Sequence, residues 1–226
     1  YESVFEVNLI HSEMEDCATK IADYLLQIKA IKLQPSNPFT WASGWKSPIY
    51  CDNRKTLSFP EVRSFISEKF AEYVRNLYPD AEIIAGVATG AIAHGVLTAD
   101  KLNLPFIYVR SGAKEHGLGN QIEGYFEPGR KVVVIEDLVS TGGSSLGAVK
   151  ALREAGCDVL GMLAIFTYEF ERAADGFAAQ GCKLDTLGNY STLIETALSS
   201  GYIGESELET LKRWRTDPSG WGQKSD

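Results

Sequence analysis

Residues 131–145 read KVVVIEDLVSTGGSS, and they limit the possible folds of this chain more than any other segment. The β-branched apolar residues 132–135 are typical of a strand that is buried on both faces. Two acids, Glu136 and Asp137, follow this run, and a stretch of small residues follows at 140–145. Apolar residues then recur at helical spacing. This order predicts the strand–loop–helix connection of an α/β protein, with an acid pair where the strand ends.

The small-residue loop has the composition of an anion site. Glycines let the backbone come close to a ligand, and hydroxyls with free N–H groups at a helix N-terminus hold a phosphate. Acids before such a loop can accept hydrogen bonds from sugar hydroxyls or help to hold a hydrated Mg²⁺. An ordinary turn between strand and helix is the alternative, but it leaves the two carboxylates and four hydroxyls unexplained. Neither a P-loop nor a G-x-G-x-x-G pattern is present, so a sugar-phosphate site is predicted.

The segment resembles the phosphoribosyl diphosphate (PRPP) signature of type I phosphoribosyltransferases. Both have four apolar residues, two acids, two apolar residues and Ser-Thr-Gly-Gly-Ser. The resemblance implies an α/β fold with a central, mainly parallel sheet flanked by helices and a small N-terminal hood lobe. It also implies that the acids bind the ribose, that the loop binds the 5-phosphate, and that Asp137 is catalytic. The implied PRPP-binding residues here are Glu136, Asp137, Leu138, Val139, Ser140, Thr141, Gly142, Gly143 and Ser144.

Bulk properties restrict the class of protein. A chain of 226 residues suits one domain, and 44% hydrophobic with 23% charged residues is the composition of a soluble globular protein. A net charge of −8 argues against a nucleic-acid or membrane-surface partner. No apolar run reaches the length of a membrane span, and no signal peptide is visible. The four cysteines are scattered without zinc spacing, so we expect a cytoplasmic protein with reduced thiols.

The apolar pattern divides the chain into segments. It predicts a helix at 13–30, an irregular lobe with short strands at 35–59, and a helix at 60–77 that begins with a proline. Strand and helix alternate from there on, which indicates a parallel sheet with helices on both faces. The further expected strands are 82–86, 105–109, 131–136, 158–167 and 183–187, and the further helices are 90–102, 145–155, 170–180, 190–199 and 205–215.

This pattern gives three expected units. They are an N-terminal helix with the hood lobe (13–59), a PRPP-binding α/β core (60–217) and a flexible polar tail (218–226).

Two other loops should lie at the same edge of the sheet, because ligands of such sheets bind at the carboxyl ends of the strands. Loop 86–90 has two glycines and a threonine that can present N–H groups to an anion, although tight packing explains them as well. The segment 110–121 combines three glycines with Arg110, Lys114 and His116. A solvated surface loop is the alternative. A mobile loop with these donors can close over a diphosphate, and His116 can give it a proton.

The second of these loops resembles one branch of the family. Tyr-Val-Arg, Lys-Glu-His-Gly and Asn-Gln-Ile-Glu-Gly occur in this order, as in the catalytic loop of orotate phosphoribosyltransferases. The resemblance implies a homodimer in which loop 110–121 covers the active site of the partner subunit. Arg110, Lys114 and His116 are then PRPP-binding residues, with Lys114 and His116 catalytic. Ser111 stands where the family often has lysine, so one diphosphate contact is missing or is supplied elsewhere.

Residues 39–50, FTWASGWKSPIY, resemble the family segment F-T-x-x-S-G-x-x-S-P-x-Y, which closes over the pyrimidine ring. The resemblance implies that Tyr50 stacks on the flat base and that Lys46 meets a substrate anion. Ser140 is the third residue expected at the orotate. A small aromatic packing cluster explains the two tryptophans of this segment equally well.

Three positions depart from the family pattern. Ala42 and Gly90 stand where some members have lysine, so a mechanism that depends on either lysine does not transfer to this chain. Tyr168 stands where some members carry an orotate-binding arginine. Recognition of the orotate carboxylate is therefore expected from backbone N–H groups and Ser140.

The implied function is Mg²⁺-dependent transfer of ribose 5-phosphate from PRPP to orotate, giving orotidine 5'-monophosphate and diphosphate in de novo pyrimidine (UMP) biosynthesis. Mg²⁺ is expected on PRPP and water, with no direct protein ligand. A phosphoribosyltransferase for another base is the alternative enzyme, and residues 39–50 and 110–124 argue against it. A regulator that keeps the PRPP site without catalysis is the other alternative. The donors of the loop and the acidic charge argue against a regulator.

Overall fold

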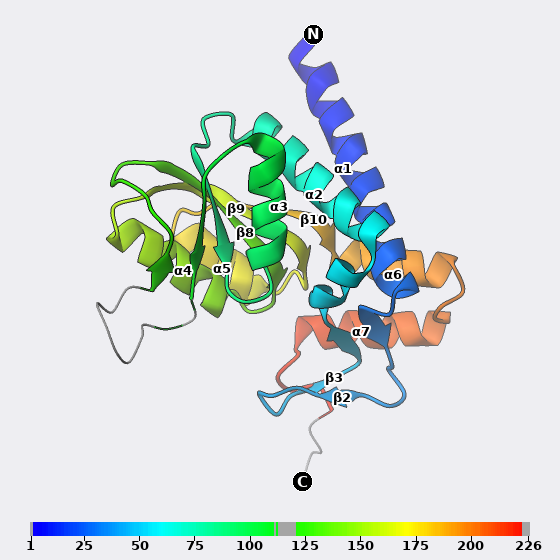
Figure 1. Cartoon of the computed structure of the whole chain (residues 1–226). Coiled ribbons are helices and arrows are strands. Elements are labelled where there is room, and N and C mark those ends of the chain that lie inside the picture. Colours follow the sequence, from blue (N-terminus) through cyan, green and yellow to red (C-terminus); the bar gives the residue numbers. More distant parts are fainter. Residues whose placement is uncertain (1, 111, 113–120, 223–226) are drawn as a thin grey trace.

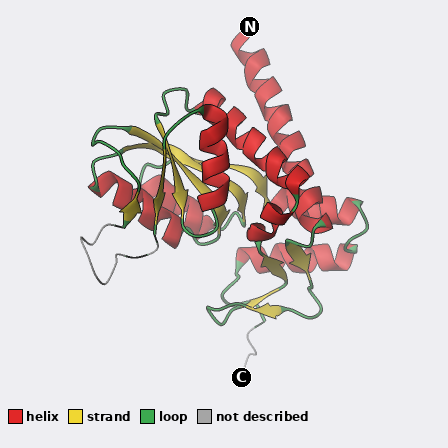
Figure 2. Ribbon diagram, in the orientation of Figure 1, coloured by secondary structure: helices red, strands yellow, loops and turns green. Residues whose placement is uncertain are grey.

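A six-stranded sheet forms the centre of the molecule, in a computed structural model that describes residues 2–110, 112 and 121–222, with side chains from residue 12. The strand order is β10-β9-β8-β5-β6-β7, and only β7 runs antiparallel to its neighbour (Figures 1 and 2). The mainly parallel sheet predicted from the alternating pattern is therefore confirmed. The strands are β5 (Ile83–Val87), β6 (Phe106–Val109), β7 (Ile122–Glu123), β8 (Lys131–Val139), β9 (Asp158–Thr167) and β10 (Leu184–Asn189).

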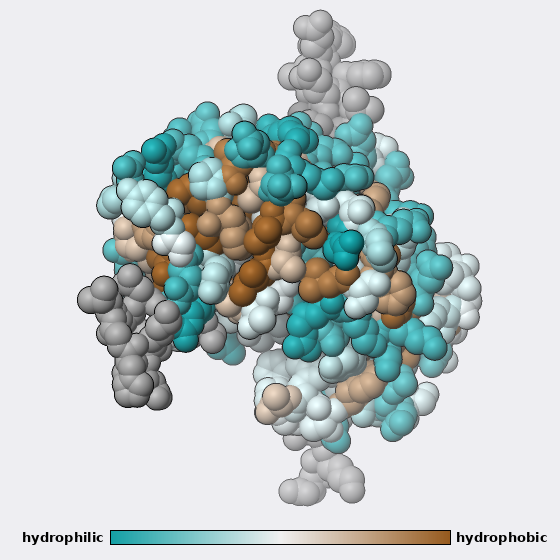
Figure 3. Space-filling view, viewed as in Figure 1, coloured by the Kyte–Doolittle hydropathy of each residue, from teal (hydrophilic) through white to brown (hydrophobic). Residues whose placement is uncertain are grey.

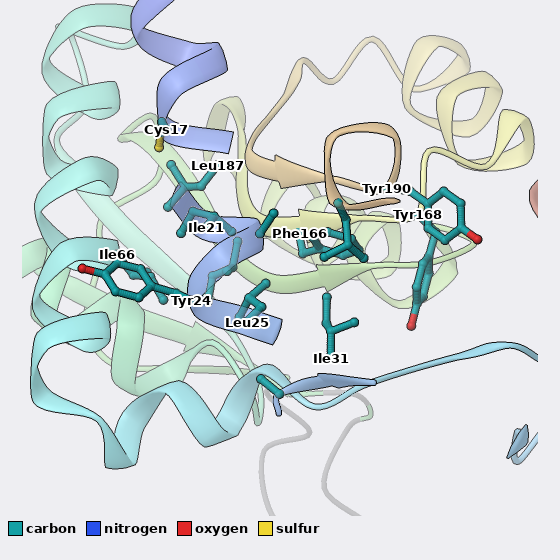
Figure 4. Packing of buried hydrophobic residues seen from close by; sticks show 14 of the residues in the cluster. Cys17, Ile21, Tyr24, Leu25, Ile31, Ile66, Phe166, Tyr168, Leu187 and Tyr190 are labelled. Atoms are coloured by element: carbon teal, nitrogen blue, oxygen red, sulfur yellow. The ribbon is translucent and has the colours of Figure 1, made fainter. Parts of the chain in front are cut away.

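Helices cover both faces of this sheet. Along β8, Val133 and Ile135 point into one core cluster, while Val132 and Val134 point into the other, as alternation along a strand requires. The first cluster lies under α1 (Glu2–Gln27), α2 (Pro60–Leu77), α3 (Ile92–Leu102), α6 (Tyr190–Ser199) and α7 (Glu205–Thr216). The second lies under α4 (Gly143–Glu154) and α5 (Glu171–Ala179). Figure 4 shows part of the first cluster, where α1 packs on the sheet.

The hood, residues 31–59, consists of two short antiparallel pairs and a 3₁₀ helix. Strands β1 (Ile31–Leu33) and β4 (Ile49–Cys51) pair, as do β2 (Phe39–Thr40) and β3 (Lys46–Ser47). The 3₁₀ helix η1 (Asn53–Ser58) leads into α2. The ring of Trp41 lies 5.4 Å from that of Tyr168 and 5.6 Å from that of Trp214. Trp214 also donates from Nε1 to the carbonyl of Lys46. Aromatic packing therefore fastens the hood to the core.

The structure differs from the sequence expectation mainly at β8. This strand continues through the acid pair to Val139, because β9 pairs with it as far as Val139↔Thr167. Helix α1 also begins earlier than expected, at Glu2. In the described part of the tail, Trp221 packs against the first core cluster. Residues 223–226 lie outside the described residues. The predicted division of the chain into units at residues 59 and 217 stays a prediction.

The cysteines and the hydropathy of the helices are two further properties of the fold. All four cysteines are free thiols. In the described ranges, no helix combines the length and the apolar character needed to cross a membrane.

Candidate active site

Three loops meet at the carboxyl edge of the sheet, because β6, β5 and β8 are parallel neighbours. Loop 88–91 follows β5, and its Ala88–Thr89 peptide is cis. The Asp137 carboxylate lies so close to Gly90 that a Cβ at that position would overlap it. A side chain at position 90, lysine included, therefore requires Asp137 to move. The other loop glycine, Gly86, is packed closely against the backbone, since a Cβ at this position would lie 2.9 Å from the Ala91 carbonyl oxygen.

The two acids of the signature face opposite sides of the sheet, because they are successive residues of one strand. Glu136 is buried, and its two oxygens accept hydrogen bonds from the Ser145 hydroxyl and the Asp137 N–H, each at 2.9 Å. Burial, helped by the neighbouring Asp137, raises the pKa of Glu136 to about 8. Asp137 instead lines a cavity. The structure thus brings Asp137 to an open site, and the ribose contact of Glu136 stays a prediction.

The Asp137 cavity has a volume of about 340 Å³ and is mostly polar. Asn53, buried at its wall, donates from Nδ2 to the carbonyl of Asp137 at 2.6 Å. Arg54 donates from Nε to Asp52 Oδ1 at 2.7 Å, which places a cation at the cavity. We did not predict Asn53 or Arg54, although the polar run that follows Tyr50 was a signal. The lining residues are Cys51, Asp52, Asn53, Arg54, Thr89, Gly90, Asp137 and Leu138.

The Tyr168 cavity, of about 290 Å³, lies between the hood and the end of β8. Two predicted orotate residues, Tyr50 and Ser140, line it. The third, Lys46, does not line this cavity. Its ammonium donates to Oγ1 of Thr40 at 2.7 Å, and Thr40 is a lining residue. The lining residues are Thr40, Trp41, Ala42, Tyr50, Cys51, Leu138, Ser140 and Tyr168. Because this cavity and the Asp137 cavity share Cys51 and Leu138, they adjoin.

The predicted phosphate loop opens helix α4. Gly142 has φ +83°, a conformation that favours glycine, and no side chain caps the helix N-terminus. Gly143 and Ser144 are exposed. The first N–H groups of α4 are therefore available to an anion. Val139 is buried in the second core cluster, so any PRPP contact at this residue must come from its backbone.

The ends of loop 110–121 are held together. The Arg110 N–H donates to the Gln121 carbonyl at 2.9 Å, and Gln121 Nε2 donates to the Arg110 carbonyl at 2.7 Å. Arg110 Nη1 lies 3.7 Å from Glu123 Oε1, and this buried nitrogen makes no hydrogen bond with the described residues. Lys114 and His116 lie outside the described residues, so their roles stay predictions.

Comparison with known proteins agrees with this geometry. The model of the phosphoribosyl transferase domain matches residues 55–185, which include the signature strand and its loop. The orotate phosphoribosyltransferase of Porphyromonas gingivalis is 56% identical over 209 residues, covering 92% of this chain and 100% of that protein. The enzyme of that name from Bacillus caldolyticus is 56% identical over 202 residues, covering 89% and 98%.

A solved structure agrees as well. The orotate phosphoribosyltransferase of Aeropyrum pernix has a TM-score of 0.71 at 28% identity, covering 81% of this chain and 99% of that one. The two curated relatives match 92% and 89% of this chain, not only the PRPP signature. On the evidence of this full-length similarity and the PRPP-type loop at the sheet edge, the chain belongs to the orotate phosphoribosyltransferase family.

Proposed function

We propose that the two adjoining cavities transfer ribose 5-phosphate from PRPP to orotate, giving orotidine 5'-monophosphate and diphosphate. The observation that carries this proposal is the junction at Cys51 and Leu138. On one side lies a polar cavity with Asp137, next to the free N–H groups of α4. On the other lies a cavity with aromatic walls that suits a flat base. A sugar phosphate and a base in these two cavities meet at the junction.

The reaction forms a bond between a pyrimidine nitrogen, which gives up its proton to solvent, and the anomeric carbon, and it breaks the bond from that carbon to a diphosphate oxygen. The diphosphate leaves with the electron pair, and the configuration inverts. Positioning and stabilisation of charge then supply most of the catalysis. Asp137 holds the ribose and faces the positive charge that develops on it. Arg110, Lys114 and His116 neutralise the departing diphosphate, and His116 supplies its proton.

The carboxylates that line the Asp137 cavity are suitable for a bound Mg²⁺ ion. Asp137 and Asp52 line the same cavity and offer the oxygen ligands that Mg²⁺ prefers. Among the described side chains, no group of three His, Cys, Asp or Glu residues could hold a metal ion. The ion is therefore proposed to reach the site mainly on PRPP and water. When bound, it would offset the charge of the diphosphate.

We also propose a cytoplasmic homodimer that acts in pyrimidine biosynthesis. An apolar area lies open over helix α3 (Figure 3), where Val96 is 45% exposed. A second copy that covers this area would bury it. Loop 110–121 begins at β6, the strand next to α3 in the chain, and is proposed to reach the partner's active site. The reduced thiols agree with a cytoplasmic location.

The test is an assay with PRPP and Mg²⁺ in which orotate, uracil, adenine and hypoxanthine are offered side by side. We expect consumption of orotate alone. Consumption of a purine without orotate would overturn the acceptor assignment and leave the PRPP site standing.

A further inference from the structure

Tyr168 presents an unused hydroxyl to the proposed base site. Its side chain is 2% exposed and lines the Tyr168 cavity. No described residue makes a hydrogen bond with this hydroxyl, whereas the neighbouring Tyr190 donates its own to the Leu211 carbonyl at 3.0 Å. The two tyrosines lie side by side at the edge of the first core cluster, 6.4 Å apart (Figure 4). This hydroxyl is not sealed in the core, so a ligand that enters the Tyr168 cavity can accept its hydrogen bond.

Packing fixes the Tyr168 ring in place. Trp41 and Phe170 lie 5.4 Å from it between ring centroids, and Trp214 lies 5.7 Å away. These partners come from the hood, the loop after β9 and helix α7. A side chain that is held from three directions cannot turn its hydroxyl elsewhere, so the donor is already oriented before a ligand enters.

Among the described residues, the Tyr168 cavity is lined only by neutral groups. None of its eight lining residues carries a charged side chain at neutral pH. Burial raises the pKa of Tyr168 well above its usual range, so the hydroxyl keeps its proton. Burial also raises the pKa of the Cys51 thiol, which stays neutral as well. An anionic group in this cavity must therefore be held by hydrogen-bond donors rather than by a paired cation.

Orotate needs such donors at its carboxylate, which is adjacent to the ring nitrogen that accepts the ribose. That nitrogen must face the Asp137 cavity, so the carboxylate lies close to the junction at Cys51 and Leu138. Tyr168 lines the same cavity as Cys51 and Leu138, so its side chain borders the space that leads to this junction.

We propose that the Tyr168 hydroxyl donates a hydrogen bond to the carboxylate of orotate, which makes Tyr168 a specificity-determining residue. The proposal rests on the proposed function. It gives the base site a neutral donor in addition to Ser140, so orotate should bind without an arginine or lysine inside the cavity.

The test is steady-state kinetics of Tyr168→Phe with orotate and PRPP varied separately. The ring and its packing remain, and only the hydroxyl is lost. We expect the KM for orotate to rise about tenfold or more, as for loss of a hydrogen bond to a charged group, while the KM for PRPP stays unchanged. The matched control is Tyr73→Phe, which removes a buried hydroxyl beside Cys17 that lines neither cavity. This control should keep both KM values.

Two results would overturn the inference. One is an unchanged KM for orotate in an active Tyr168→Phe enzyme. The other is an equal rise in both KM values with a lower melting temperature, which is the signature of a purely structural role. A wild-type enzyme that uses PRPP with another base but not with orotate would instead refute the proposed function, and the inference with it. The two failures are therefore distinguishable.

Discussion

The two acidic residues at the end of β8, Glu136 and Asp137, are adjacent in the chain but lie in different surroundings. Asp137 faces a cavity, with Gly90 close to its carboxylate and Asn53 bonded to its carbonyl. Glu136 faces helix α4 and accepts hydrogen bonds from the Ser145 hydroxyl of that helix and from the Asp137 N–H of its own strand. The difference follows from the strand, which turns successive side chains to opposite faces. We infer that Asp137 serves the substrate and that Glu136 also holds the phosphate loop against the strand, while its ribose contact stays a prediction.

The largest effect is expected for Asp137→Asn. This change keeps the shape and removes the negative charge in the cavity, so turnover should fall by about 10²–10³-fold, as for loss of one stabilising group in a preorganised site. The measurement is kcat with both substrates saturating. Thermal unfolding serves as the control and should be nearly unchanged. Turnover close to that of the wild type would remove Asp137 from the chemistry.

Gly90→Ala also tests the Asp137 side of β8, because Gly90 lines the same cavity as Asp137. The added Cβ would displace the Asp137 carboxylate, and a misplaced group of this kind should lower turnover by about tenfold to a hundredfold. Gly147→Ala on α4 is the matched control, because a Cβ there meets no atom within 4 Å. That control should keep its turnover. Equal turnover in the two variants would contradict the close approach of Asp137 to Gly90.

Ser145→Ala tests the other side of the strand. It leaves one oxygen of the buried Glu136 without its donor, so the free energy of unfolding should fall by about 1–3 kcal/mol. Urea denaturation measures this change. Ser144→Ala is the control, because Ser144 is exposed and its loss should cost far less. A similar loss in both variants would mean that the Ser145–Glu136 bond contributes little.

The pH dependence of stability probes Glu136 itself. Its pKa is raised to about 8 in the folded chain, so between the unfolded value of 4.5 and pH 8 the folded state keeps a proton that the unfolded state releases. The stabilising contribution is therefore complete below pH 4.5 and is lost as the pH rises through 8. Glu136→Gln removes this dependence, and its stability should gain about 1–3 kcal/mol on the wild type between pH 5 and 8. Parallel pH profiles would contradict the buried, protonated Glu136.

Local patterns were sufficient to predict most of the elements. Helix α2 and strand β9 have the predicted bounds, because a proline opens the one and a long apolar run forms the other. The extension of β8 could not be predicted in this way. Two carboxyl groups disfavour a buried strand, and only pairing with β9 accounts for it.

The site was less accessible to sequence reasoning, because its contacts join distant segments. Asn53 reaches Asp137 across 84 positions, and no local pattern encodes such a pair. The environment of Tyr168 depends on Trp41 and Trp214, from opposite ends of the chain. The resemblance predicts that Lys46 meets an anion, which stays a prediction; Lys46 does not line the Tyr168 cavity, and its ammonium donates to Thr40, which does.

The central claim is that the two adjacent acids have different roles, and the turnover of Glu136→Gln relative to Asp137→Asn tests it most directly. Both changes replace a carboxyl group by an amide of the same shape, one on each side of β8. At pH 7 we predict that Glu136→Gln stays within about tenfold of the wild type, because the native side chain is already protonated, whereas Asp137→Asn loses about a hundredfold or more. Equal losses in the two variants would contradict the account.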